Sequence, residues 1–179
     1  MGVGLAKKSK LKETTLQYLA EHYTMALATA QDGTPWAASV FYANDGFTLY
    51  FLSDPESRHS IDITGNPVVG VTVNEDYHDW RKIKGIQMEG KAELVTAEDD
   101  MTRAVATYAA KYPFTVPYLK LMSSPFPGIV RHLDKILEKL PFTVGLPKTF
   151  NVKFYRLTAT RIRFTDNEKG FAHHDEFTL

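Results

Sequence analysis

Two Asp-Gly pairs, Asp32-Gly33 and Asp45-Gly46, constrain the fold of this chain more than any other feature of its sequence. An Asp-Gly pair between two β-type runs is typical of a two-residue hairpin turn, because glycine adopts positive φ without steric cost. A parallel sheet would need a helical crossover between consecutive strands, and these connections are too short for one. The sequence therefore predicts an antiparallel meander of three strands, at 24–30, 36–42 and 47–52.

Beyond the meander, the spacing of apolar residues predicts further strands and peripheral helices. A helical period predicts an amphipathic helix over 9–22 and another over 96–111. The polar tract from Ser53 to Ser57 predicts the start of a short helix, with Asp54 as its cap. The remaining β-type runs are 68–73, 81–96, 152–157 and 160–165. About six strands with peripheral helices predict a mainly β fold, a small closed antiparallel barrel bent at glycines such as Gly90.

Residues 113–148 are rich in proline and hold one predicted helix, at 128–140. Because proline interrupts helices and sheets, we expect this segment to be an insertion or lid outside the barrel core. The chain is then predicted to end in a polar tail over 166–179. No internal repeat divides the sequence, and 179 residues suffice for one well-buried core, so a single domain over 1–179 is expected.

The composition limits the kinds of function that are open to the chain. Lysine plus arginine and aspartate plus glutamate both number 21, so no overall field attracts nucleic acid or anionic membrane. The absence of cysteine excludes disulfides, thiolate metal sites and thiol catalysis. The sequence contains neither a recognisable secretory signal nor an apolar run of membrane-spanning length. We therefore expect a soluble, cytoplasmic protein.

The segment from Ser53 to His59 carries the strongest chemical signal. A strand end followed by a helix start leaves unpaired backbone N–H groups and the positive end of a helix dipole at one point. The hydroxyls of Ser53 and Ser57 and the N–H groups of Arg58 and His59 add donors, which together suit a phosphate monoester. The alternative is an ordinary capped helix with solvated polar residues, and spacing alone leaves both interpretations open.

Two other segments carry weaker signals. In 80–90, alternation places Gln87 on the same face as Gly85, where a planar ligand could approach closely; the alternative is a curved barrel strand with a solvated basic side. In the tail, His173, His174 and Asp175 suggest a metal or haem ligand. Adjacent histidines on an extended chain point in opposite directions, however, so a disordered polar terminus is the simpler interpretation.

Taken together, these segments resemble the pyridoxamine 5′-phosphate oxidase-like family of FMN-binding split barrels, over about 20–96 and 150–175. The motifs that carry the resemblance occur in the family's order: 36–42, 46–53, Ser57-Arg58-His59, Asn66-Pro67-Val68-Val69 and Lys84-Gly85-Ile86-Gln87-Met88-Glu89-Gly90. The run Ile162-Arg163-Phe164-Thr165-Asp166-Asn167, followed by Gly170-Phe171, is similar almost position for position to the YhbP-like branch of that family.

The resemblance implies a homodimer that holds flavin mononucleotide (FMN) at its interface. It implies that Arg58 and His59 bind the FMN phosphate, with Ser53 and Ser57 beside them. An excess of aromatic residues in 36–42 and 47–51 over what one small core needs also favours a dimer.

The same resemblance implies how the flavin ring is held. The backbone of Val40, Phe41 and Tyr42 would lie along the isoalloxazine, and Lys84 or Gln87 would approach it from the partner chain. In the tail, Asp and Asn predict a turn over 165–170. We expect this turn to return the chain so that Phe171 covers the partner's flavin and His173 or His174 reaches its polar edge. Deletion of 171–179 would then change flavin binding while the barrel stays folded.

Departures from the family pattern limit what the resemblance implies about the substrate. His59 replaces a lysine, and Gly85 stands where the oxidases carry a flavin-contacting glutamine. The oxidases' C-terminal Arg-x-His substrate clamp is absent, with Phe171-Ala172-His173-His174 in its place. The leading hypothesis is therefore an FMN-dependent oxidoreductase with a different substrate. The alternatives are a non-catalytic module that stores or senses FMN, and a haem-binding split barrel with His173 or His174 as axial ligand.

Overall fold

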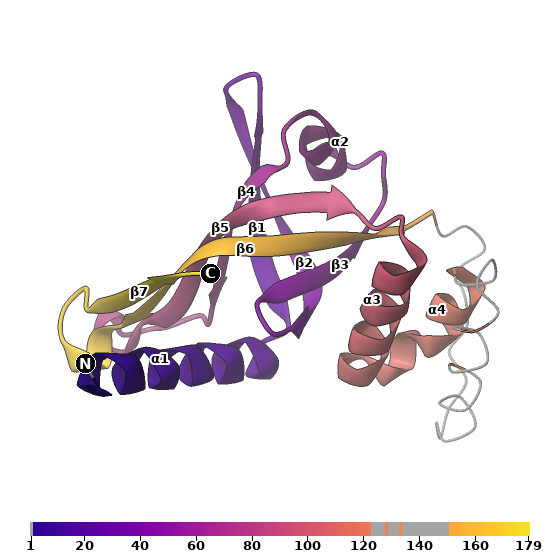
Figure 1. Cartoon of the computed structure of the whole chain (residues 1–179). Helices are drawn as coiled ribbons and strands as arrows, with labels where there is room; N and C mark the ends of the chain where they lie inside the picture. The colour runs from indigo at the N-terminus through magenta and orange to yellow at the C-terminus, as the bar shows by residue number, and fades with distance from the viewer. Residues whose placement is uncertain (1, 123–127, 129–132, 134–150) are drawn as a thin grey trace.

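The computed structural model describes residues 2–122, 128, 133 and 151–179, which form one antiparallel sheet flanked by helices (Figure 1). The seven strands of this described part are hydrogen-bonded in the order β3-β2-β1-β4-β5-β6-β7. A further pairing of β3 with β6 closes the first six strands into a barrel. The predicted mainly β fold, a six-stranded antiparallel barrel with peripheral helices, is confirmed.

The predicted meander consists of β1 (Thr24–Gln31), β2 (Thr34–Asp45) and β3 (Thr48–Ser53). The Asp32-Gly33 turn joins β1 to β2, with φ of 50° and 75° at its two residues. Positive φ at both central positions is what a type I′ hairpin turn requires, and this turn matches the twist of the flanking strands. Local turn chemistry therefore determines the register of the first hairpin.

The barrel is completed by β4 (Val68–Asn74), β5 (Lys84–Leu94) and β6 (Lys153–Asp166). The two strands expected at 152–157 and 160–165 form one continuous strand, which pairs with β3 on one side and with β5 on the other. β5 starts later than predicted because Trp80–Lys82 forms a short 3-10 helix, η1. The register of β5 against β6 shifts beside Gly90, which confirms the predicted irregularity there.

Gly90 is required by the close approach of β6. A Cβ atom at this position would lie 2.3 Å from the backbone oxygen of Thr158, so one of the two strands would have to move. We expect Gly90→Ala to lower the free energy of unfolding by about 2 kcal/mol or more, as measured by urea denaturation. Gly70→Ala is the matched control, because its nearest contact would be an ordinary 3.8 Å. Equal losses in the two variants would contradict this explanation.

A final strand, β7 (His174–Thr178), corrects the prediction of a polar tail over 166–179. The chain turns through the 3-10 helix η3 (Asn167–Lys169) and runs back antiparallel to β6. The predicted turn is confirmed, and the alternative of a disordered terminus is wrong. The physical reason is Phe177, which is 4% exposed and packs in the barrel core against Phe47.

Four α-helices lie in the described part of the chain: α1 (Gly2–Glu21), α2 (Arg58–Gly65), α3 (Glu98–Lys111) and α4 (Val116–Met122). α1 begins before the predicted residue 9, in a stretch whose described side chains are exposed and carry no apolar stripe. α4 follows a 3-10 turn, η2 (Pro113–Thr115), within the proline-rich segment. The helix predicted at 128–140 lies outside the described residues, apart from 128 and 133. None of the described helices is both long and apolar enough to cross a membrane.

The start of α2 differs from the prediction in a way that matters for the site. Asp54 accepts a hydrogen bond from the backbone N–H of Glu56 and stabilises a turn, so it does not cap the helix. The helix begins three residues later, with Ser57 at the N-cap position and Arg58 as its first residue. Arg58 and His59 therefore lie in the first helical turn.

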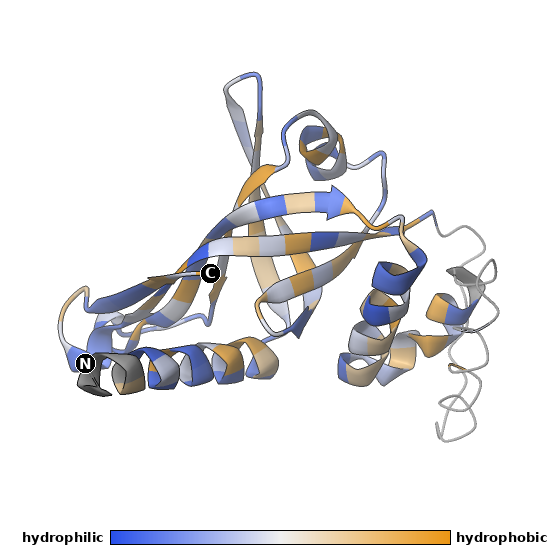
Figure 2. Cartoon of the chain, in the orientation of Figure 1, coloured by the Kyte–Doolittle hydropathy of each residue, from blue (hydrophilic) through white to orange (hydrophobic). Residues whose placement is uncertain are grey.

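Buried apolar side chains form two clusters, and hydrophobic and hydrophilic residues alternate along strands such as β5 (Figure 2). The first cluster fills the barrel and includes Phe51, while the second joins Tyr50 and Phe154 to Tyr108 of α3. The aromatic residues of 47–51 are thus covered within the chain. This corrects the part of the dimer argument that relied on them.

Candidate functional site

Three serine hydroxyls and one imidazole converge where β3 ends and α2 begins. Ser53 Oγ lies 3.0 Å from Ser57 Oγ and 2.5 Å from His59 Nε2. Ser60, from the first turn of α2, donates from its Oγ to Ser53 at 3.2 Å and accepts from Ser57 at 2.9 Å. Ser60 is fully buried and Ser53 is 6% exposed, so Ser57 is the hydroxyl of this group that is open to an incoming acceptor, with the other two behind it. We call Ser53, Ser57, Arg58, His59 and Ser60 the serine–arginine cluster.

Arg58 extends the cluster with a cation that is held on two sides. Its Nε donates to Asp62 Oδ1 at 2.8 Å, one helical turn further along α2. Its guanidinium carbon lies 5.8 Å from the centre of the Trp36 ring, on β2. Asp62 is fully buried and also accepts from Thr29 Oγ1 of β1 at 2.8 Å. The arginine is therefore tied to both strands of the first hairpin.

The charges in the cluster follow from these contacts. Burial lowers the pKa of His59 below its ordinary value of 6.5, against a smaller opposite effect of Asp62, so the ring is neutral at pH 7. Burial alone would raise the pKa of Asp62. Hydrogen bonds from Arg58 and Thr29 and the nearby guanidinium outweigh this effect, and the net pKa lies below the ordinary range. The Arg58–Asp62 pair is therefore ionised, and the donor set suits a phosphate monoester.

The outer edge of β2 lies open beside this cluster. The N–H of Tyr42 donates to the carbonyl of Tyr23, just before β1, so the backbone groups of Tyr42 face the edge of β2 that pairs with β1. By alternation, the backbone N–H and C=O groups of Ala37 and Ser39 point to the opposite edge. β3 pairs with β2 only over 42–45, and no other strand of the described part covers 34–41 on that edge. Unpaired backbone groups are thus available to a ligand.

The three predicted ring-binding residues of β2 have different environments. Val40 is half-buried against the barrel core. Phe41 is 55% exposed and contacts the edge of the Tyr112 ring. Tyr42 is fully buried, and its hydroxyl donates to the carbonyl of Leu19. Of the three side chains, only Phe41 faces solvent, and the backbone N–H and C=O groups of Val40 and Tyr42 are turned toward β1.

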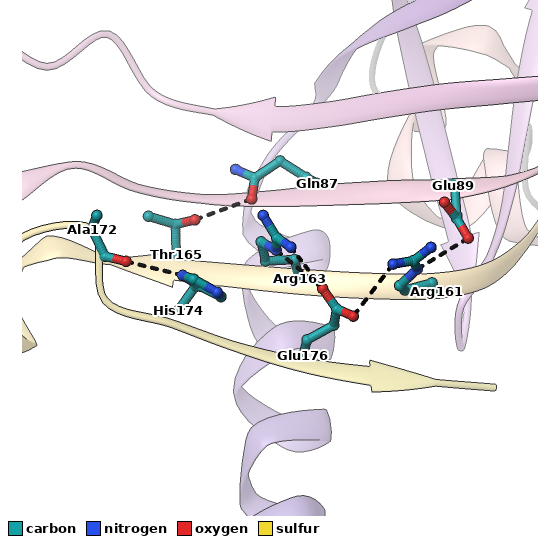
Figure 3. Close-up of polar contacts among 8 residues, drawn as sticks. All are labelled: Gln87, Glu89, Arg161, Arg163, Thr165, Ala172, His174 and Glu176. Carbon is teal, nitrogen blue, oxygen red and sulfur yellow. Dashed lines mark hydrogen bonds and ion pairs between the residues drawn. The ribbon is translucent and has the colours of Figure 1, made fainter.

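Gln87 and Lys84 lie elsewhere on β5. Gln87 is exposed and accepts from Thr165 on a polar face of β5, β6 and β7 that also holds the Arg163–Glu176 ion pair (Figure 3). Lys84 binds Glu168 at 2.5 Å. In the described residues, no hydrogen bond or ion pair joins Gln87 or Lys84 to the serine–arginine cluster. A single chain therefore does not unite all the predicted site residues.

The tail residues make contacts of their own. Phe171 is 81% exposed and meets the Trp80 ring edge-on, with ring centroids 5.2 Å apart. His173 lies 3.5 Å from Asp175, whereas His174 bonds through Nδ1 to the carbonyl of Ala172 (Figure 3). The described residues contain no group of three His, Cys, Asp or Glu side chains arranged to hold a metal ion.

Sequence reasoning missed four residues of this region: Thr29, Trp36, Ser60 and Asp62. The spacing Arg58-x-x-x-Asp62 on a predicted helix is a signal for an ion pair and could have identified Asp62. Ser60 could have been found from its place in the first turn of the same helix. Thr29 and Trp36 come from the hairpin, and only the tertiary fold brings them to α2.

Comparison with known proteins identifies the family. A family model described as pyridoxamine 5′-phosphate oxidase matches residues 11–139. The chain belongs to this family. A UPF0306 protein of Cronobacter sakazakii is 32% identical over 124 residues, which are 67% of this chain and 80% of that protein. UPF0306 protein YhbP of Escherichia fergusonii is 26% identical over 112 residues, 61% of this chain and 72% of that protein. The resemblance to the YhbP-like branch is confirmed.

Solved structures share the fold of this family member. A haem-binding protein from Mycobacterium smegmatis has a TM-score of 0.66 at 16% identity, covering 93% of this chain and 57% of that chain. A Listeria innocua protein, provisionally assigned as a pyridoxamine 5′-phosphate oxidase, has a TM-score of 0.56 at 19% identity and covers 86% of this chain and 97% of that chain. Likeness at these identities extends to the fold alone.

Proposed function

We propose that this protein binds FMN and acts as an FMN-dependent oxidoreductase on a substrate other than pyridoxamine 5′-phosphate. The observation that carries the proposal is the serine–arginine cluster, whose hydroxyls and guanidinium supply donors for a terminal phosphate. Family membership supports the same cofactor. When bound, the flavin would supply hydride or electron transfer, while the protein binds and orients it.

The open edge of β2 supports a place for the flavin ring. The backbone groups of Ala37 and Ser39, which no strand of the described part covers, offer the alternating donors and acceptors that a heterocycle edge needs. Trp36 links this strand to Arg58. A phosphate at the cluster and a ring along β2 would thus use one continuous surface of the chain. Gln87 or Lys84 would then come from the partner, since neither contacts the cluster within the chain.

Titration of the purified protein with FMN, riboflavin and haem tests this proposal. We expect FMN to bind more tightly than riboflavin, because only FMN carries the phosphate. Reduction of the bound flavin by NAD(P)H, followed by reoxidation, separates an oxidoreductase from a non-catalytic FMN module. The haem-binding neighbour from M. smegmatis makes haem the second candidate. Tight haem binding with no flavin binding would favour it, with His173 or His174 as the ligand to test.

A homodimer is expected from the surface on the outer face of β1, β2 and β4. The paired residues there are small, and exposed Phe41 and Val68 lie on the same face. Such a surface suits a second copy of the chain. Sedimentation should therefore detect a dimer at micromolar concentration, and Ala28→Glu should convert it to a folded monomer. A monomer that retains FMN would contradict the shared site. The small residues are Ala26, Ala28, Ala37, Ser39, Gly70 and Thr72.

FMN affinity should depend on pH through His59. The ring is neutral near pH 7 because burial lowers its pKa, whereas a bound phosphate dianion would favour the imidazolium. Binding then takes up a proton, so affinity should rise up to about tenfold as pH falls from about 8 to about 6.5. This window stays above the second phosphate pKa, near 6. In His59→Gln the profile should be flat; a flat profile in the wild type would contradict proton uptake.

A further inference from the structure

The Arg58–Asp62 pair has a feature that the phosphate proposal alone does not explain. Asp62 is fully buried, and a buried carboxylate is unfavourable unless it is paired and hydrogen-bonded. Both of its oxygens are used: Oδ1 accepts from Arg58 Nε, and Oδ2 accepts from Thr29 Oγ1, each at 2.8 Å. The carboxylate is therefore fixed between α2 and β1, and it fixes the arginine in turn.

The contacts of Arg58 determine which of its donors remain. A guanidinium has five N–H donors in one plane, and Asp62 takes only the one on Nε. Trp36 lies against the guanidinium at 5.8 Å. Within the described residues, no hydrogen bond uses Nη1 or Nη2, and the Arg58 side chain is 45% exposed. Four N–H groups of this half-exposed guanidinium thus have no hydrogen-bond partner among the described residues.

We propose that Asp62, together with Trp36, is a positioning residue that holds the guanidinium of Arg58 with its Nη groups directed at the terminal phosphate of FMN. This inference rests on the proposed function and adds a residue that acts through Arg58 rather than on the ligand. A pre-oriented guanidinium loses less conformational freedom on binding than a free arginine side chain, so the phosphate is bound more tightly.

The direction in which one substitution changes FMN affinity separates a positioning role from a purely electrostatic one. If only charge mattered, removal of the negative charge of Asp62 near a phosphate dianion would strengthen FMN binding. Positioning has the opposite consequence, because Asp62→Asn keeps the shape and loses the charge-assisted bond that orients Arg58. We expect Asp62→Asn to weaken FMN about tenfold and to leave riboflavin affinity unchanged.

Asp54→Asn is the matched control. Asp54 is an exposed carboxylate just before this helix, and within the described residues no hydrogen bond or ion pair joins its side chain to Arg58. The same chemical change there should leave FMN affinity equal to the wild type or slightly tighter. In addition, Asp62→Asn should not weaken FMN binding further in an Arg58→Ala background, because a residue that acts through Arg58 has nothing left to orient.

The outcomes distinguish failure of this inference from failure of the proposed function. A wild type that binds FMN and riboflavin equally contradicts the phosphate site itself. A wild type that prefers FMN, with an Asp62→Asn variant that binds FMN as tightly or more tightly, overturns the positioning role alone. If Asp62→Asn does not fold, Trp36→Leu replaces it, since Trp36 is 47% exposed. A preference for FMN over riboflavin that is unchanged in that variant would also overturn the proposal.

Discussion

Replacement of Arg58 by alanine is expected to weaken FMN binding at least tenfold while riboflavin affinity stays unchanged. Charge-assisted hydrogen bonds contribute about 1.5–3 kcal/mol each, and about 1.4 kcal/mol corresponds to tenfold in affinity. The Nη groups of Arg58 are not used by other described residues, so the alanine removes donors that only a phosphate would engage. Quenching of flavin fluorescence on titration measures both affinities.

The matched control for this substitution is Arg103→Ala. Arg103 lies on α3, is 63% exposed and has Asp100 at 4.0 Å. Its replacement changes the net charge equally, so it corrects for any long-range effect of charge on an anionic ligand. Since Arg58→Ala leaves Asp62 without its cation, circular dichroism must show that the variant is folded. Equal loss of FMN and riboflavin affinity in folded Arg58→Ala would contradict the phosphate assignment.

The features of the fold that the sequence predicted correctly depend on residues that are close together along the chain. The Asp32-Gly33 turn was predictable because Gly adopts positive φ without steric cost and Asp tolerates it in turns. The break between helix and strand at Gly65-Asn66-Pro67 is equally local. The exact start of α2 was not predicted, because Asp54 can stabilise either a helix or the turn that precedes it.

The features that were not predicted from the sequence depend on contacts between residues that are far apart along the chain. β7 has a single buried apolar side chain, and the alternation of its polar residues resembles a solvated tail. It forms where β6 extends beyond β3 and offers a free edge, and burial of Phe177 in the core holds it there. Likewise, the residues Ser57-Arg58-His59 identified the centre of the candidate site, but nothing local placed Trp36 and Thr29 around Arg58 and Asp62.

Loss of the Phe177 side chain is expected to cause the largest fall in stability of any change in the tail. Phe177 is 4% exposed, meets the Phe47 ring edge-on at 5.3 Å, and carries the Lys12 ammonium over its face at 5.5 Å. It therefore ties β7 to the barrel core and to α1. Truncation of such a buried aromatic residue costs about 3–5 kcal/mol, so Phe177→Ala should lower the free energy of unfolding by that amount.

Phe171→Ala provides the comparison within the same tail. Phe171 is 81% exposed, so its replacement should change stability by no more than about 0.5 kcal/mol. Guanidinium denaturation followed by circular dichroism measures both variants.

Deletion of residues 171–179 would remove Phe177 and uncover the core, so we no longer expect the barrel to stay folded in that variant. Phe171→Ala is therefore the sharper probe of the tail's contact with flavin: it keeps β7 in place, and only a residue that covers the flavin would then alter FMN affinity. Similar stabilities for Phe177→Ala and Phe171→Ala would show that β7 contributes nothing to the core.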